Sequence, residues 1–345
     1  MKKFVIFLIL IFFNNLNAIN YPNSTTETDR ITNVLTVLQG LNAGDTVSTA
    51  VQGLCWFKAG LSVDGASAGR VNFSCPIPVD REIYLNEDVV LDLHKDLVFS
   101  GSVRLARSGN IIAGSATRLE SSIILTGPFD LGSKTLTCTY GPMFINGNGN
   151  VIDFRKGGRI FYDSRNTNDA GRTAATIRNC ELRGVKFETE ADSRLWLRNY
   201  SAFNWDNVLL RLDGDYLIPN IDYKHLNIIG DVLVTGTYMF KMDGTCNVSY
   251  NSLFCFDVGT TFSIGRTAVF TSDGSGRAGF YFNGCNINIS AKDFLIDNAT
   301  LIFSNEVRIT DENWNRKFII GSNCNVILLA GARILLDGTT TLSLL

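Results

Sequence analysis

Histidine is scarce in this chain, and so are the residue arrangements on which familiar enzymes and metal sites depend. The 345 residues contain two histidines, His94 in "DLHKD" and His225 in "YKHLN", and both fit surface or turn positions better than catalysis. No Cys-x-x-Cys spacing, Ser/His/Asp set or glycine-rich phosphate loop is present. These absences exclude the common metal-ligand, acyl-transfer and nucleotide-binding patterns, and we predict no catalytic residue.

The chain also lacks an excess of positive charge. Without Lys2 and Lys3, 29 of the 31 basic residues remain against 33 acidic ones, a net charge of −4. This balance argues against a nucleic-acid partner. The sequence is instead rich in glycine, asparagine, threonine, isoleucine and phenylalanine, a composition typical of strands and turns.

The only long apolar run lies at the N-terminus. Two lysines precede the ten residues "FVIFLILIFF", and "NNLNA" follows, ending at Ala18. This order is typical of a secretory signal peptide over residues 1–18. A membrane anchor is the alternative, but a bilayer span needs about 20 apolar residues. We therefore expect a secreted or cell-surface protein with no membrane span once the signal is removed.

A repeated phrase indicates the architecture. Cys246, Cys285 and Cys324 each precede Asn and an aliphatic residue, and the interval from the first to the second equals that from the second to the third. Asparagine-aliphatic pairs also recur at intervals near 20, half of the cysteine interval, and apolar residues alternate with polar ones within each unit. Period two indicates strands, and a fixed period near 20 indicates a solenoid. We therefore predict an all-β, single-stranded parallel β-helix over residues 82–345, with coils of about 20 residues and a small N-terminal cap over 19–81.

On this interpretation the three cysteines occupy one place on every second coil and point inward. Two coil rises, about 9.6 Å, are too far for a disulfide. The cysteines would therefore be buried fillers that are not bonded to one another. The asparagines that follow them could bond amide to amide along the rod. A disulfide is predicted elsewhere, between Cys55 and Cys75.

"FINGNGNVIDF" (residues 144–154), "VVLDLHKDLVFSG" (89–101) and "FDLGSKTLTCTYG" (129–141) resemble the coils of right-handed parallel β-helix proteins of the pectin-lyase-like group. The resemblance implies that fold and raises the possibility of cleavage of acidic polysaccharides. The catalytic pattern of polygalacturonases does not carry over. "NTND" at Asn166 is a poor copy of Asn-Thr-Asp, no Asp-Asp or Gly-His-Gly exists, and "VRIT" at Val307 lacks the lysine.

Two groups of residues are candidate sites. Aromatic rings beside arginine and aspartate suit sugars, and residues 193–216 concentrate Trp196, Arg198, Trp205, Arg211, Asp213 and Asp215. The plainer interpretation is that these rings pack a loop against the rod. Asp273, Asp293 and Glu312 fall at similar offsets in the repeat and could bind Ca²⁺, although aspartate is also simply common in turns.

Together these features predict a structural, adhesive or glycan-binding β-helix whose partner is a polysaccharide or cell-surface glycan. The alternative is a polysaccharide lyase or glycoside hydrolase with a site near residues 160–220. An enzyme should place two carboxylates, or a carboxylate and an arginine, in one open groove, whereas a binding rod need not.

Overall fold

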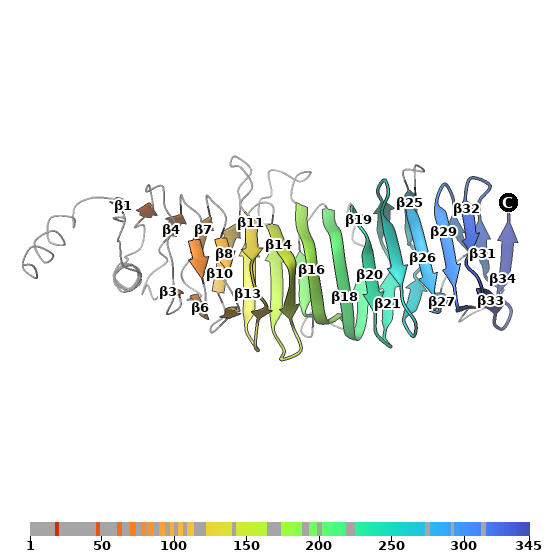
Figure 1. Cartoon of the computed structure of the whole chain (residues 1–345), viewed down its shortest axis with the longest axis horizontal. Helices are drawn as coiled ribbons and strands as arrows, with labels where there is room; N and C mark the ends of the chain where they lie inside the picture. The colour runs from red at the N-terminus through yellow and green to blue at the C-terminus, as the bar shows by residue number, and fades with distance from the viewer. Residues whose placement is uncertain are drawn as a thin grey trace, which may run out of the picture.

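The structure is a computed structural model. It describes residues 122–139, 143–163, 174–187, 193–198, 202–218, 225–272, 277–290, 293–311 and 315–345, and in addition the backbone strands β1 to β10. Residues 1–17 of the predicted signal peptide (1–18), most of the predicted cap, Cys55 and Cys75 lie outside these residues. The described part is an elongated rod of parallel strands with no helix, which confirms the all-β solenoid (Figure 1).

The first half of the rod contains seventeen strands. They are β1 (Ala18–Asn20), β2 (Thr46–Ser48), β3 (Leu61–Val63), β4 (Arg70–Phe73), β5 (Ile77–Val79), β6 (Glu82–Leu85), β7 (Val90–Leu93), β8 (Leu97–Phe99), β9 (Val103–Leu105), β10 (Gly109–Ala113), β11 (Ser122–Leu125), β12 (Phe129–Asp130), β13 (Thr135–Thr139), β14 (Met143–Asp153), β15 (Arg159–Asp163), β16 (Ala174–Phe187) and β17 (Leu195–Arg198).

The second half continues the same arrangement. It contains β18 (Ala202–Ile218), β19 (His225–Ile228), β20 (Val232–Thr235), β21 (Met239–Met242), β22 (Thr245–Val248), β23 (Leu253–Phe256), β24 (Thr261–Ile264), β25 (Val269–Ser272), β26 (Gly279–Asn283), β27 (Asn286–Ile289), β28 (Phe294–Ile296), β29 (Thr300–Ser304), β30 (Glu306–Asp311), β31 (Lys317–Ile320), β32 (Asn325–Leu328), β33 (Arg333–Leu336) and β34 (Thr341–Leu344).

Each coil has three sides. The long strand β18 shows this directly, because its successive parts pair in parallel with three separate strands of the next coil, β19, β20 and β21. The next coil is formed by β22, β23 and β24, which stack on those three strands in the same order. Every described strand pairing is parallel, so a residue lies above its register partner at about 4.8 Å, the ordinary strand spacing.

Alternation within each strand fills the interior of the rod. In β23 and β26 the side chains of Phe254, Phe256, Phe280 and Phe282 point inward and are almost fully buried. The rings of Phe256 and Phe282, which are register partners on adjacent coils, stack at 6.1 Å between centroids with 14° between planes. Burying each such ring stabilises the fold by about 2 kcal/mol, so the phenylalanine columns account for much of the cohesion between coils.

Asparagine forms the corners. All seven described non-glycine residues with positive φ are asparagines, for example Asn179, Asn207 and Asn251 at 50°, 54° and 58°. Asparagine tolerates this left-handed conformation better than other side chains, because its short amide can bond locally. Tight corners of the coils therefore account for these seven asparagines.

A second set of asparagines stacks along the rod. Asn227 Nδ2 donates to Asn204 Oδ1 at 2.8 Å, and Asn247 Nδ2 donates to Asn227 Oδ1 at 2.9 Å. Thr271 extends the row, because its hydroxyl bonds Asn247 Oδ1. These residues are register partners on successive coils. The expected amide-to-amide stacking is thus present in this row, although the asparagines that follow Cys285 and Cys324 do not belong to it.

The coil length differs from the sequence prediction. The chain separation between hydrogen-bonded register partners is 20 for Asn227 and Asn247, 24 for Asn247 and Thr271, and 28 for Thr176 and Asn204. A typical separation is therefore nearer 24 than the predicted 20. The value of 20 holds for some coils only, such as those that pair Asn227 with Asn247 and Val90 with Asn110. Turns of different length at the corners account for the variation.

The constant sequence spacing of the three cysteines does not correspond to two coils of the rod. Cys246 lies in β22, Cys285 directly precedes β27, and Cys324 directly precedes β32. Each interval is five strands, and the three cysteines lie on three different sides of the rod. The prediction that they share one place was therefore wrong. All three are free thiols, and burial is complete for Cys246 and Cys285 but partial for Cys324.

The parallel sheets continue to both ends of the described rod. Strands β4 and β5, within the segment predicted as a cap, pair in parallel with β7 and β8 of the solenoid. At the other end, Val326, Leu328, Leu336 and Leu344 occupy positions that point inward on earlier coils. They are exposed because no described strand pairs with the outer edges of β32, β33 and β34.

Candidate functional site

The six residues predicted to bind a ligand do not form one site. Trp196 and Arg198 lie on β17, the last strand of one sheet. The other four lie on β18, in a different sheet. Within β18, Arg211, Asp213 and Asp215 are exposed, whereas Trp205 is buried. The structure therefore divides the predicted cluster between two sheets and the core.

Trp205 is a core residue, so the expectation that its ring could be exposed for a ligand is wrong. Its side chain is 0% exposed and lies among the rings of Phe203, Tyr216, Phe240 and Phe254, at centroid distances of 5.1 to 6.4 Å. Among the described residues, its indole Nε1 has no hydrogen-bond partner. For this residue the plainer packing interpretation is correct.

Trp196 is different, because its ring lies on the outer side of β17 and is partly exposed. It stacks on Phe161 of β15 with 4.4 Å between ring centroids and 23° between planes. The guanidinium carbon of Arg159 lies 5.8 Å from the centre of the indole. No described strand pairs with the far edge of β17. Trp196, Phe161 and Arg159 form what we call the aromatic platform.

The alternation of β15 and β17 creates this platform. Ile160 and Leu195 point inward as register partners, so the residues that follow them, Phe161 and Trp196, meet on the outside. An aromatic pair with an arginine over the indole supplies ring contact and a charged group in one place, the combination that suits sugar rings. Arg198 lies two residues beyond Trp196, in register with Asp163.

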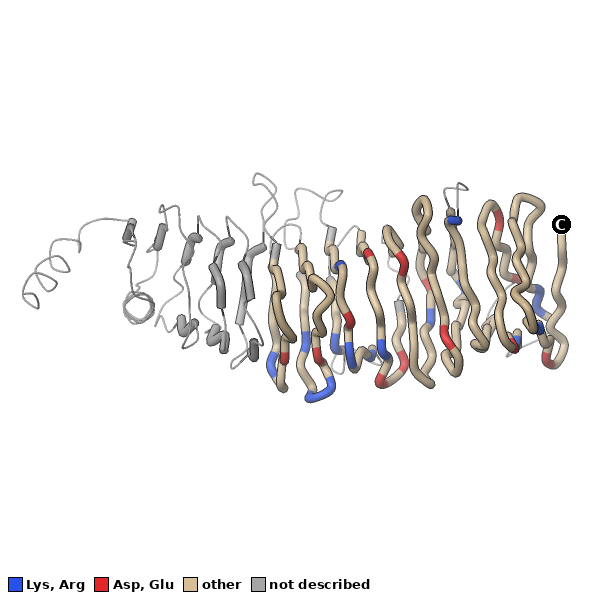
Figure 2. The backbone as a smooth tube through the Cα atoms, viewed as in Figure 1, with Lys and Arg blue, Asp and Glu red and all other residues tan. Residues whose placement is uncertain are grey.

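A charged cluster covers the outer side of β14, β16 and β18. Glu181 Oε1 accepts hydrogen bonds from Arg183 Nε at 2.8 Å and from Arg211 Nε at 2.7 Å. Asp153 bonds Arg155 through both carboxylate oxygens, with the shortest contact at 2.6 Å. In the described rod, positive and negative residues are interspersed (Figure 2), so this cluster is one of several mixed groups.

These bonds fix the ionisation of the two carboxyl groups. The hydrogen bond from Arg183 is the main cause that lowers the pKa of Glu181, and Arg211 adds to it, against the opposing effect of partial burial. The hydrogen bond from Arg155 likewise lowers the pKa of Asp153. Both groups therefore stay ionised at neutral pH and act as acceptors for arginine.

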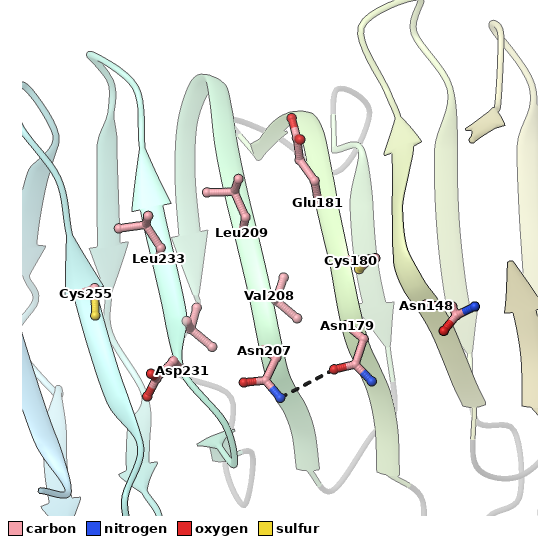
Figure 3. Close-up of a pocket in the computed structure, with 12 residues that line it drawn as sticks. Asn148, Asn179, Cys180, Glu181, Asn207, Val208, Leu209, Asp231, Leu233 and Cys255 are labelled. Carbon is pink, nitrogen blue, oxygen red and sulfur yellow. Dashed lines mark hydrogen bonds between the residues drawn. The ribbon is translucent and has the colours of Figure 1, made fainter. Parts of the chain in front are cut away.

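An open groove runs along the corner where the second side of each coil begins. Figure 3 shows its two rows: the corner residues Asn148, Asn179, Asn207 and Asp231, and the outward residues Glu181, Leu209, Leu233 and Cys255. Asn207 Nδ2 donates to Asn179 Oδ1 at 3.4 Å. The groove offers amides and carboxylates beside an aliphatic strip.

The remaining aspartates of the predicted cluster differ in their partners. Asp215 Oδ1 accepts the backbone N–H of Met239 on the next coil at 2.9 Å and so helps to fix that corner. Asp213 is exposed on the outer side of β18. Neither contacts the aromatic platform through a hydrogen bond among the described residues.

The predicted calcium column lies mostly outside the described residues, which include Asp293 but neither Asp273 nor Glu312. Asp293 is exposed, and its Oδ1 accepts the backbone N–H of Lys317 at 3.0 Å. Because Phe294 pairs with Phe318, the residue beside Asp293 on the next coil is that lysine. The described residues contain no group of three potential metal ligands.

The sequence interpretation missed Phe161, Arg159, Glu181 and Arg183. Alternation in "RIFYD" and "CELRG" places each of them on the outer side of a strand. The sequence separation between each residue and its register partner on the next coil exceeds the predicted coil length, as for Arg183 with Arg211 and Phe161 with Trp196. A period of 20 could not have paired them.

No family model, curated protein or solved structure matches this chain. In the part of the chain that the structure describes, no helix has the length and apolarity needed to cross a bilayer.

Proposed function

We propose that this chain is a secreted or cell-surface β-helix that binds a polysaccharide or cell-surface glycan, with a structural or adhesive role. The observation that carries the proposal is the aromatic platform: a partly exposed tryptophan, stacked on a phenylalanine, with an arginine beside it. The signal-like N-terminus supports the exterior location. The regular sides of the rod favour contact with a repeating polymer at several points.

The binding free energy expected from this platform is modest. A sugar ring that stacks on Trp196 would remove apolar surface from water and contribute about 1 to 3 kcal/mol. Phe161 holds the indole in place, so little side-chain freedom is lost on binding. By the usual conversion, loss of the ring weakens binding by about 5- to 150-fold.

The polysaccharide lyase or hydrolase alternative meets one expectation, because the open groove holds two carboxylates, Glu181 and Asp231, but a hydrolase requires more than that. A glycosidase needs one carboxyl group with a raised pKa to protonate the leaving oxygen. Among the described acidic residues, the shifted ones are Asp130, Asp153 and Glu181, and the pKa of each is lowered. Residues 164–173, within the predicted enzyme region, are outside the described part.

A glycan array tests the proposal, with the wild type, Trp196→Ala and Tyr238→Ala. Tyr238 is a matched control, because it is an aromatic residue that is 40% exposed and lies away from the platform, next to β21. We expect the wild type and Tyr238→Ala to bind the same glycans and Trp196→Ala to lose them. If the wild type binds none, or if both variants lose binding equally, the proposal is wrong. Thermal unfolding of each variant confirms that the rod is intact.

A further inference from the structure

The charged cluster contains two arginines whose side chains are held by hydrogen bonds but still have unused donors. Arg183 and Arg211 are register partners on adjacent coils, so their Cα atoms lie about 4.8 Å apart. Both bond the same oxygen of Glu181, and both do so through Nε. Neither Nη nitrogen of either residue has a hydrogen-bond partner among the described residues.

This geometry orients the two guanidinium groups. A guanidinium has five N–H donors, so one that is held at Nε alone still has its Nη donors available. The side chain of Arg211 is 52% exposed and that of Arg183 is 35% exposed, whereas Glu181 between them is 16% exposed. The partly buried carboxylate therefore anchors the two more exposed guanidinium groups.

The charges around this pair balance, because Arg155, Arg183 and Arg211 face Asp153, Glu181 and Asp213; the free donors, and not a net positive charge, would therefore hold an anion. Two arginines against Glu181 leave one unit of positive charge. Asp153 is paired with Arg155 through both of its oxygens and so is largely compensated. Asp213, exposed on β18, offsets that positive unit and acts electrostatically on Arg155, whereas Asp130, the register partner of Asp153, is paired with Lys156.

We propose that Arg183 and Arg211 form an oxyanion-binding site, which takes a carboxylate or sulfate ester group through the free Nη donors of both arginines. Two adjacent planar donors match the several oxygens of such a group, and this gives bidentate geometry that a lysine cannot supply. The site lies in a different sheet from Trp196 and does not depend on the aromatic platform.

The test uses a fluorescent dextran sulfate oligomer, with neutral dextran as a control, in buffer of about 20 mM ionic strength so that charges are weakly screened. Fluorescence polarisation is measured for the wild type, Arg183→Gln, Arg211→Gln, Arg211→Lys and Arg308→Gln. Arg308 is the matched control: it is similarly exposed at 48%, but its Nη groups already contact Glu306 and Asp337. Competition by sodium sulfate and by sodium acetate shows which group is preferred.

We expect the wild type to bind dextran sulfate and not neutral dextran. Arg183→Gln and Arg211→Gln should each weaken binding about fivefold or more, whereas Arg308→Gln should not. Arg211→Lys keeps the charge but loses the planar fork, so it should weaken binding while leaving the net charge unchanged. A further variant measured in the same way, Asp213→Asn, removes an opposing negative charge and should strengthen binding.

Three results would overturn the inference. The first is no binding of dextran sulfate by the wild type. The second is an equal loss with Arg308→Gln, which would indicate attraction by overall charge. The third is an Arg211→Lys variant that binds as well as the wild type. Circular dichroism of each variant confirms folding, and Arg183→Gln keeps the test valid if one Arg211 variant does not fold. Glycan-array results with Trp196→Ala are independent of these outcomes.

Discussion

Replacement of Trp205 by two different residues tests how the core of the rod is built. Trp205 is completely buried and contacts four aromatic residues from three coils, so Trp205→Ala removes a large side chain that its neighbours cannot replace. Large-to-small changes of this kind cost about 3 to 5 kcal/mol. We expect a loss of that size in the free energy of unfolding.

Trp205→Phe should behave differently. The smaller ring forfeits about 2 kcal/mol of apolar burial. However, the indole Nε1 is buried and finds no hydrogen-bond partner in the described part of the chain. Burial of such a group costs about 1 to 3 kcal/mol, which phenylalanine does not incur. The two effects nearly cancel, so the net change should lie within about 1 kcal/mol.

The assay is urea unfolding followed by circular dichroism, with the wild type and Trp196→Ala as the reference for a surface tryptophan. Because a solenoid can unfold in stages, midpoints are compared only if the slopes of the transitions agree. The reasoning fails if Trp205→Ala unfolds within about 1 kcal/mol of the wild type, or if Trp205→Phe is as destabilised as Trp205→Ala.

Three further predictions concern the asparagine row, acid stability and the thiols. Asn227→Ala leaves Asn204 Oδ1 and Asn247 Nδ2 without their partners, so urea unfolding should show a loss of about 1 to 3 kcal/mol; no loss would contradict the row. The folded-state pKa of Glu181 is below its ordinary value of 4.5, so its stabilising contribution is present above that pH and is lost as the pH falls through the folded value. Glu181→Gln should therefore show a weaker dependence of stability on pH below about 4.5, which acid unfolding checks. Burial raises the pKa of Cys285 to about 12, so a thiol reagent at pH 8 should label it only after denaturation, and rapid labelling of the native protein would contradict its burial.

The fold class could be predicted from the sequence because alternation and turn chemistry are local signals. The same alternation was enough to place Trp205 inside, since Phe203 and Trp205 alternate with the polar residues Asn204 and Asp206. The aromatic content of the segment favoured a binding interpretation and outweighed that signal. Trp196, between Leu195 and Leu197, has the outward parity that the structure confirms.

Register could not be predicted, because it depends on how many residues each corner takes. Chain separations of 20 and of 28 between register partners occur in the same rod, so no single period aligns distant residues. The pairing of Arg183 with Arg211 and of Phe161 with Trp196 follows only from those corner lengths. This is why the candidate sites changed while the fold class did not.

Cross-linking of introduced cysteine pairs tests the coil length most directly. Arg211 and Thr235 are register partners on the outer side of the rod, so their Cα atoms should lie about 4.8 Å apart. The shorter coil predicted from the sequence would instead place Asp231 beside Arg211. Asp231 precedes Thr235 by four residues, so its Cα atom should lie about 13 Å from that of Thr235 along the strand. A short thiol cross-linker should join the cysteines of Arg211→Cys/Thr235→Cys and leave those of Arg211→Cys/Asp231→Cys apart. The opposite result, with the Asp231 pair joined and the Thr235 pair separate, would contradict the coils described for this rod.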